Sequence, residues 1–197
     1  MEDLLVQEDW HPPVYVITGD PCEGKTGFLM KVLAGLNREN LKIRGFVAPG
    51  RFTDNVRSGF SLIDLSTGES EELCSSARYP ECRQFGRFYF RKEGLSFGYR
   101  ALSPLRAGGD TDLLVIDEIG LFELKGEVWS RCLDRIVSMP HPPMIWTVRR
   151  SLLDAIGRRW PVRRQIVIEL DHVSPETWSC EIKKEIAIFR SQQRLKR

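Results

Sequence analysis

The sequence is short of net charge, of long apolar runs and of paired cysteines. Its 29 Lys and Arg residues against 27 Asp and Glu residues give a formal charge of +2, which offers no argument for a nucleic acid or an anionic membrane as a partner. No apolar run approaches the roughly 20 residues of a membrane span. The first ten residues, MEDLLVQEDW, lack the basic and apolar regions of a secretory signal. We therefore expect no membrane association.

The cysteines and histidines exclude two further classes of protein. The cysteines are odd in number, scattered and without a Cys-x-x-Cys pair: Cys22, Cys74, Cys82, Cys132 and Cys180. The histidines share no metal-ligand spacing: His11, His141 and His172. This pattern argues against a disulfide-stapled domain and against a zinc site. It indicates a reducing compartment, and we expect the protein in the cytoplasm.

The chain also lacks repeats, low-complexity stretches and linkers rich in Pro, Gly or Ser. A length of 197 residues then favours one domain over residues 1–197. Strand-like and helix-like segments alternate along it, which favours an α/β sandwich with a mostly parallel sheet. The expected strands are 14–18, 113–117, 144–147 and 166–170, and the expected helices are 25–38, 128–137 and 175–190, with a partly helical stretch at 95–107.

The middle of the chain, from about residue 42 to residue 90, has a different pattern. Segments such as RSGFSLIDL and RFYF are separated by turn-prone residues and scattered glycines. This pattern predicts antiparallel hairpins laid against the parallel sheet. We interpret it as an insertion and not as a second domain.

A phosphate-loop motif follows the first expected strand. It matches G-x-x-x-x-G-K-[ST] at every fixed position: Gly19, Asp20, Pro21, Cys22, Glu23, Gly24, Lys25 and Thr26. The glycines let successive N–H groups turn toward phosphate oxygens, and the helix that follows directs its positive dipole end at them. Lys25 supplies a mobile positive charge to the β- and γ-phosphates, and Thr26 offers a hydroxyl to Mg²⁺. The alternative is a glycine turn that merely precedes a helix.

Two carboxylates end the expected strand at 113–117. Asp117 and Glu118 follow four apolar residues, and burying them is costly unless a positive or hydrogen-bonding group compensates. Beside a phosphate loop this group is Mg²⁺, held by Thr26 and Asp117. Glu118 is then placed to orient or deprotonate a water that faces the γ-phosphate. The alternative is a strand that leaves the core and exposes two ordinary acids.

Residues 117–124, DEIGLFEL, resemble the D-E-I-G-x-x-E-L signature of the small P-loop nucleoside-triphosphatases, the family that includes the cancer-related nucleoside-triphosphatase. The similarity covers about residues 14–170 in order and includes Gly45-Phe46, Arg57-Ser58-Gly59-Phe60, Ile63-Asp64-Leu65 and Arg87-Phe88-Tyr89. The resemblance implies a RecA-like three-layer sandwich, Mg²⁺-dependent hydrolysis of several nucleoside triphosphates such as ATP and GTP, and weak base selectivity.

The sequence departs from that family at two places. Gly27 follows Thr26 where many such loops carry a second hydroxyl residue. The family's T-x-E-V-R after Gly-Phe is replaced by Ala48-Pro49-Gly50-Arg51, so no role of that acidic residue can be transferred.

Arginines are the candidates for neutralising charge on the γ-phosphate during transfer: Arg51, Arg57, Arg149 and Arg150. Arg57 is preferred because it lies in a segment that resembles the family, and the alternative for each is a solvated surface residue. Thr147 ends an expected strand where related ATPases place a γ-phosphate sensor, and its alternative is a plain strand-end hydroxyl. Glu123 and Leu124 are expected to cap and pack the turn after the strand and not to act on the substrate, and the alternative for Glu123 is a supporting role behind the residues that contact the substrate.

We expect hydrolysis of the β–γ bond of ATP and other nucleoside triphosphates, with water as the nucleophile. One alternative is a small-molecule or polynucleotide kinase, and another is an ATP-gated module that binds RNA or a protein and hydrolyses slowly. Six arginines and one acid between residues 149 and 164 can track a nucleic-acid backbone, but such a run is usually a solvated face. A nucleic-acid partner is left open but not favoured, and the oligomeric state is left open.

Overall fold

The computed structural model describes residues 10–36, 40–103, 111–170 and 174–195. The strands are β1 (Val14–Gly19), β2 (Ile43–Val47), β3 (Gly50–Thr53), β4 (Val56–Asp64), β5 (Ser70–Ser75), β6 (Arg83–Phe85), β7 (Phe88–Phe90), β8 (Leu113–Ile119), β9 (Met144–Arg149) and β10 (Gln165–Glu169). The helices are α1 (Lys25–Gly35), α2 (Lys92–Ala101), α3 (Leu121–Leu124), α4 (Ser130–Val137), the short 3₁₀ helix η3 (Arg150–Leu152), α5 (Leu153–Arg159) and α6 (Pro175–Leu195).

The central strands of the sheet are parallel and lie in the order β10-β1-β9-β8-β2. The apolar run of β8 is fully buried from Leu113 to Ile116, as expected of a strand that is covered on both faces. β9 lies between β1, which leads into the phosphate loop, and β8, which ends in the acidic pair. Because the carboxyl ends of parallel strands meet at one edge of a sheet, the predicted site residues gather there.

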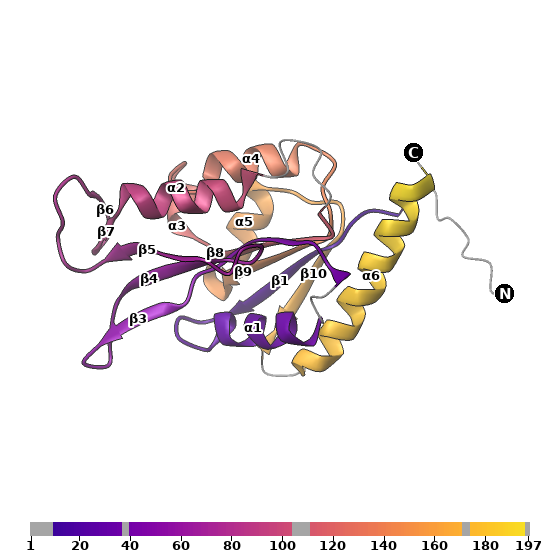
Figure 1. Cartoon of the computed structure of the whole chain (residues 1–197), viewed down its shortest axis with the longest axis horizontal. Helices are drawn as coiled ribbons and strands as arrows, with labels where there is room; N and C mark the ends of the chain where they lie inside the picture. Colours follow the sequence, from indigo (N-terminus) through magenta and orange to yellow (C-terminus); the bar gives the residue numbers. More distant parts are fainter. Residues whose placement is uncertain (1–9, 37–39, 104–110, 171–173, 196–197) are drawn as a thin grey trace.

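Antiparallel strands extend the sheet beyond β2, in the order β4-β5-β7-β6, with β3 paired to β4. The expected hairpins are therefore present, but β2 itself pairs in parallel with β8. β2 thus has a parallel neighbour, β8, on one side and an antiparallel neighbour, β4, on the other, so the change from parallel to antiparallel pairing occurs at β2. In Figure 1 these strands project from the parallel part of the sheet, away from α6.

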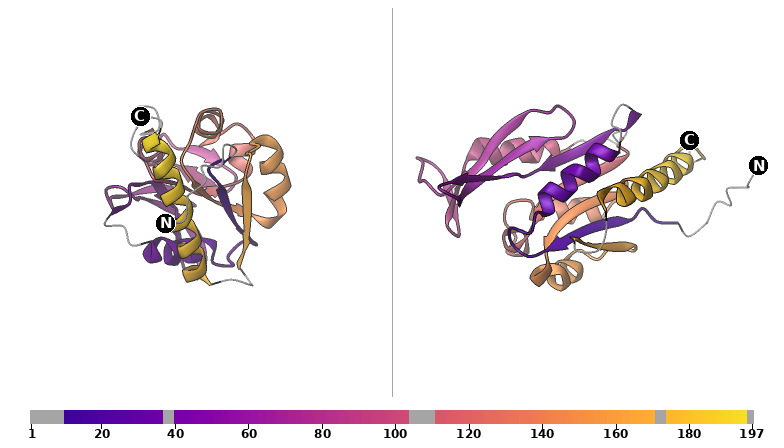
Figure 2. Two further views of the ribbon diagram at one scale, coloured as in Figure 1. Left: turned by 90° about the vertical axis from the view of Figure 1, so that its right-hand side faces the viewer. Right: turned by 90° about the horizontal axis from the view of Figure 1, so that it is seen from below.

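Helices cover both faces of the sheet (Figure 1). α1 and α6 lie on one face over a core that includes Leu29, Leu33 and Ile182. α2, α4 and α5 lie on the other face, where Trp129 and Trp160 are buried in a second core. Figure 2 shows α1 and α6 close to each other, and the Ser179 hydroxyl of α6 donates to the Val32 carbonyl of α1. The expected α/β three-layer sandwich is confirmed.

Element ends differ from the prediction where the backbone geometry intervenes. The helix expected at 128–137 begins at Ser130, because Val128 has a left-handed φ of 45° and turns the chain first. The last helix continues past residue 190 to Leu195. The helix expected at 95–107 spans Lys92–Ala101, and residues 104–110 lie outside the described chain. None of the helices in the described ranges is long and apolar enough to cross a membrane.

Gly45 lets β2 approach β8 closely. Its φ is +94°, and a Cβ at this position would lie 1.9 Å from the carbonyl oxygen of Val115. A side chain would therefore meet the backbone of the strand that carries Asp117, two residues further on. The space excludes every residue but glycine here.

Gly45→Ala is expected to lower the free energy of unfolding by roughly 3 kcal/mol, because it adds both a backbone clash and a strained φ. Gly68→Ala is the matched control. Gly68 also has a left-handed φ, of +75°, but nothing lies within 4 Å of its Cβ position, so we expect a loss of about 1 kcal/mol. Urea denaturation of both variants measures the difference. Equal losses would contradict the close approach of β2 and β8.

Candidate functional site

The phosphate-loop motif lies between β1 and α1, as the sequence predicts. Gly19 ends β1, and Lys25 is the first residue of α1. Two residues of the loop, Cys22 (φ 69°) and Gly24 (φ 92°), are left-handed, and their conformation turns the chain sharply into the helix. The N-terminal N–H groups of α1 and its dipole therefore face the loop, which is the arrangement that binds a phosphate.

Lys25 is folded into the loop. It is 7% exposed, and its Nζ donates to the carbonyl oxygens of Gly19 (3.1 Å) and Asp20 (2.9 Å). Burial lowers the pKa of Lys25, and the nearby Glu118 carboxylate opposes this shift. The ammonium group is thus held at the centre of the loop by neutral carbonyls that an incoming phosphate can replace.

Glu23 fills part of the same loop. Its Oε2 accepts a hydrogen bond of 2.6 Å from the backbone N–H of Asp20, and it lies 3.9 Å from Arg150. The backbone N–H of Asp20 therefore already donates a hydrogen bond to a carboxylate of the same loop, that of Glu23.

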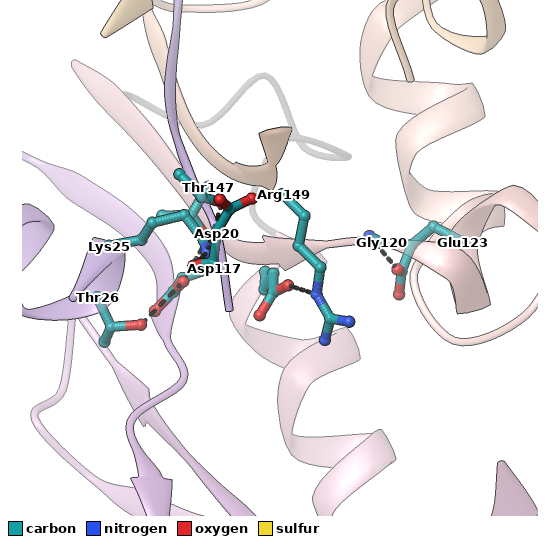
Figure 3. Close-up of polar contacts among 10 residues, drawn as sticks. Asp20, Lys25, Thr26, Asp117, Gly120, Glu123, Thr147 and Arg149 are labelled. Carbon is teal, nitrogen blue, oxygen red and sulfur yellow. Dashed lines mark hydrogen bonds and ion pairs between the residues drawn. The ribbon is translucent and has the colours of Figure 1, made fainter. Parts of the chain in front are cut away.

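Asp117 of β8 accepts hydrogen bonds from α1, from β9 and from the residue that follows β2. Its Oδ1 accepts from the hydroxyls of Thr26 (3.3 Å) and Thr147 (2.5 Å), and its Oδ2 accepts from the N–H of Ala48 (2.9 Å) (Figure 3). Asp117 is 1% exposed, and this burial raises its pKa, while the three hydrogen bonds lower it. The hydroxyl of Thr147 thus donates to Asp117. Neither Asp117 nor Thr147 is among the residues that line the cavity described below, whereas Thr26, which also donates to Asp117, is.

Thr26 and Asp117 fit the predicted magnesium site by chemistry. A hydroxyl and a carboxylate oxygen are the hard ligands that Mg²⁺ takes, and this ion usually completes its shell with water and substrate phosphates. In the part of the chain that the structure describes, no cluster of three or more His, Cys, Asp or Glu side chains suits a metal.

Glu118 forms an ion pair that the sequence did not reveal. Its Oε1 accepts from Nε of Arg149 at 2.8 Å, and the side chains are 23% and 38% exposed (Figure 3). Arg149 ends β9, the strand next to β8. The predicted base is therefore held by an arginine from the neighbouring strand.

The loop, the end of β8 and the antiparallel hairpin enclose one cavity of about 220 Å³. Its lining joins parts of the chain that are far apart in sequence: Pro21, Cys22, Gly24, Lys25, Thr26, Ala48, Gly50, Phe52, Arg57, Phe60, Glu118 and Arg149. Sequence reasoning missed Ala48, Gly50 and the two phenylalanines. The only signal for them was their position beside Arg57.

Arg57 of β4, the arginine preferred from the sequence for neutralising the γ-phosphate, lines the cavity. Its guanidinium carbon lies 5.3 Å from the ring centre of Phe52 and 5.1 Å from that of Phe60. Its Nε is buried with no hydrogen-bond partner among the described residues. Of the other candidates, Arg51 pairs with Glu72 at 2.5 Å and does not line the cavity.

The basic run at 149–164 is largely neutralised. Besides Arg149, four of its arginines have polar partners: Arg150 with Glu169, Arg159 with Asp134, Arg163 with His11 and Arg164 with Glu185. Four of the six arginines, Arg149 included, thus pair with carboxylates, which weakens the positive field that a nucleic-acid backbone would need, whereas the ring of His11 brings no negative charge to Arg163.

Comparison with known proteins places the chain in a family. The sequence model of the family described as NTPase matches residues 14–184. The chain belongs to the NTPase family. This confirms the resemblance to small P-loop nucleoside-triphosphatases.

Named relatives agree with this assignment. The nucleoside-triphosphatase THEP1 of Archaeoglobus fulgidus is 34% identical over 151 residues, which cover 74% of this chain and 85% of the relative. THEP1 of Pyrococcus abyssi is 33% identical over 142 residues, or 71% and 76% of the two chains.

Two solved NTPase structures share the fold. The crystal structure of THEP1 from Aquifex aeolicus superposes with a TM-score of 0.62 at 21% identity, over 87% of this chain and 95% of that one. The solution structure of a human cancer-related nucleoside triphosphatase gives a TM-score of 0.59 at 21% identity, over 92% and 97%.

Glu123 caps the turn after the acidic pair, as predicted. It is 3% exposed, and its carboxylate accepts from the N–H groups of Gly120 (2.7 Å) and Trp129 (3.5 Å). Burial raises the pKa of Glu123 from its ordinary 4.5 to about 7. The folded protein therefore retains the Glu123 proton over a pH range in which the unfolded chain has released it.

The Glu123 contribution to stability is fully present below about pH 4.5 and is lost as the pH rises to about 7. At about 1.4 kcal/mol per pKa unit, the change is about 3 kcal/mol. The Glu123→Gln variant should lack this dependence of the free energy of unfolding on pH. Any constant shift that the amide adds to that free energy at every pH does not affect the comparison. Urea denaturation of both proteins between pH 5 and 8 measures the difference. Parallel curves for the two proteins would refute the buried, protonated carboxyl.

Proposed function

We propose that this protein is a Mg²⁺-dependent nucleoside-triphosphatase that hydrolyses the β–γ bond with water as the nucleophile. The observation that carries the proposal is the junction at Asp117. There the hydroxyl of Thr26, which directly follows Lys25 of the phosphate loop, meets the strand that ends in Glu118. Membership of the NTPase family and the names of its relatives support the same activity.

The residues take separate roles in this proposal. The loop from Gly19 to Gly24 directs its N–H groups at the phosphates, and Lys25 balances their charge. Glu118 accepts the proton of the attacking water as the new P–O bond forms and the bond to the β-phosphate oxygen breaks. The diphosphate leaves with the electron pair of that bond.

Thr26 and Asp117 would hold Mg²⁺ together with phosphate and water oxygens. When bound, this ion neutralises charge on the β- and γ-phosphates. The hydroxyl of Thr147 and the N–H of Ala48 keep the Asp117 carboxylate aimed at Thr26. We thus assign Thr147 to positioning Asp117, while its role as a γ-phosphate sensor stays a prediction.

Arg57 is the proposed cation for the transferred phosphoryl group. It lines the cavity opposite the loop, and its buried Nε is without a protein partner in the described ranges. The rings of Phe52 and Phe60 limit its motion, so that the guanidinium is held toward the cavity.

Broad base tolerance is part of the proposal. The polar side chains that line the cavity, Lys25, Thr26, Arg57, Glu118 and Arg149, are all assigned to phosphate, metal or water, which leaves none of them to read a base. The contacts instead come from loop backbone, cations and hydroxyls, which recognise phosphate. The proposed compartment is the cytoplasm, because all five cysteines, each within the described residues, are free thiols.

Glu118→Gln should lower turnover by about 10²–10⁴-fold, because it keeps the shape but removes the basic oxygen. The affinity for a nucleoside triphosphate with Mg²⁺ should hold or rise, because a negative charge near the γ-phosphate is lost. Phosphate release and equilibrium binding of a fluorescent triphosphate analogue measure the two effects. A variant with the parent's turnover would remove Glu118 as the base.

Thr26→Val tests the metal role at the same site. The change removes the hydroxyl but keeps the shape, so the Mg²⁺ concentration for half-maximal phosphate release should rise severalfold. Glu118→Gln is the control, since its fall in turnover should not be rescued by added Mg²⁺. An unchanged Mg²⁺ requirement in Thr26→Val would exclude Thr26 as a ligand.

Phosphate release from ATP, GTP, CTP and UTP, with and without Mg²⁺, separates hydrolysis from the alternatives. We expect Mg²⁺-dependent release from all four at rates within about tenfold, because without specific base reading the four can differ by no more than about one ordinary hydrogen bond, roughly 1 kcal/mol. Slow release that a hydroxyl compound stimulates would indicate the kinase. Slow release that RNA stimulates would indicate the gated module.

A further inference from the structure

The ion pair between Glu118 and Arg149 conflicts with the role of Glu118 in hydrolysis. Oε1 accepts from Nε of Arg149 at 2.8 Å, and although Oε2 stays open to water, this charged contact fixes the direction in which the whole carboxylate faces. A base held in this way is not free to turn toward an attacking water. A competitor for Arg149 would release it.

The geometry around Arg149 suits a phosphate as this competitor. Both members of the pair line the cavity that Lys25 and Thr26 also line. In the described residues, the contact with Glu118 uses Nε of Arg149 alone, which leaves the two terminal nitrogens for an anion. An arginine fork matches phosphate oxygens in a bidentate manner, and the terminal phosphate of a triphosphate carries more charge than a carboxylate.

The pair is also weak enough to exchange. Its side chains are 38% and 23% exposed, and ion pairs of this exposure contribute little to stability because water and salt screen them. The other cations of the cavity are held differently: Lys25 by loop carbonyls and Arg57 between two aromatic rings. Of these three, only Arg149 is bound to a group that the reaction needs free.

We infer that Arg149 is a positioning residue that exchanges Glu118 for the terminal phosphate of a nucleoside triphosphate. The exchange releases Glu118 toward water only when a γ-phosphate is present. Arg149 thereby makes the site distinguish a triphosphate from the diphosphate product. This inference rests on the proposed function and adds the residue that couples substrate recognition to the base.

A double-mutant cycle in binding tests the inference without relying on turnover. The proteins are the parent, Arg149→Gln, Glu118→Gln and the double variant. The ligands are ADP and the β,γ-imido analogue of ATP, each with Mg²⁺, measured by calorimetry. Arg149→Gln should weaken the triphosphate analogue about tenfold or more and change ADP by less than about twofold, because a charged hydrogen bond to one phosphate is lost.

Glu118→Gln supplies the second arm of the cycle. It should tighten binding of the triphosphate analogue, because Arg149 no longer has to leave a carboxylate. In the double variant this gain should disappear, since no arginine is left to be released. Such coupling supports the exchange, whereas additive effects of the two changes would overturn it.

Arg159→Gln is the matched control. Arg159 is also half-exposed and held by one carboxylate, that of Asp134 at 2.7 Å, but it does not line the cavity. The Arg159→Gln variant should leave the ratio of the affinities for the triphosphate analogue and for ADP unchanged. A loss in Arg149→Gln that is equal for both nucleotides would show a general charge effect and overturn the inference.

Failure of the inference and failure of the proposed function give different results. If the parent hydrolyses triphosphates and Glu118→Gln does not, but Arg149→Gln keeps the affinity ratio, only the inference is wrong. If the parent neither binds the triphosphate analogue nor releases phosphate, the proposed function is wrong and the inference is overturned with it.

Discussion

The site depends on one buried carboxylate that must be compensated. Asp117 lies at the end of β8 and accepts hydrogen bonds from α1, from β9 and from the segment after β2, through Thr26, Thr147 and the N–H of Ala48. A carboxylate that is 1% exposed is costly without such partners. The need to satisfy it therefore holds the phosphate loop against two neighbouring strands at one edge of the sheet.

The charges around this carboxylate are balanced within the protein. Lys25 is held by loop carbonyls, Glu23 accepts from a loop N–H, and Glu118 pairs with Arg149. Each group meets a partner whose place a phosphate oxygen or a metal-bound water can take. Nucleotide binding in the proposed mechanism is thus an exchange of partners, which costs less desolvation than burying new charges.

The two halves of the sheet contribute differently to the cavity. The parallel strands are covered on both faces and carry the loop, Asp117 and Thr147 in a fixed register. The antiparallel strands project beyond them (Figure 1). They bring Arg57, with its flanking phenylalanines, to the lining of the cavity. The rigid half can therefore hold the metal and the water, while the hairpin supplies a cation from a part of the chain with no phosphate motif.

Local sequence by itself determined the elements and most of the chemistry. The strand-loop-helix around Lys25 and the apolar strand that ends in Asp117 and Glu118 follow from short-range pattern, because periodicity, glycine and charge act within a few residues. The DEIGLFEL segment was enough to indicate the family. Even the capping role of Glu123 was predicted from its place in the turn after that strand, and the structure adds its partner, the N–H of Gly120.

Contacts between distant segments were decided only by the tertiary structure. The pairing of Glu118 with Arg149, 31 residues later, depends on β8 and β9 being neighbours. The hydrogen bond from the Thr147 hydroxyl to Asp117 depends on the same register between β8 and β9. The strand order and the close approach of β2 to β8 at Gly45 arise because both faces of one sheet are buried at once. No local sequence pattern encodes which strands become neighbours in that sheet.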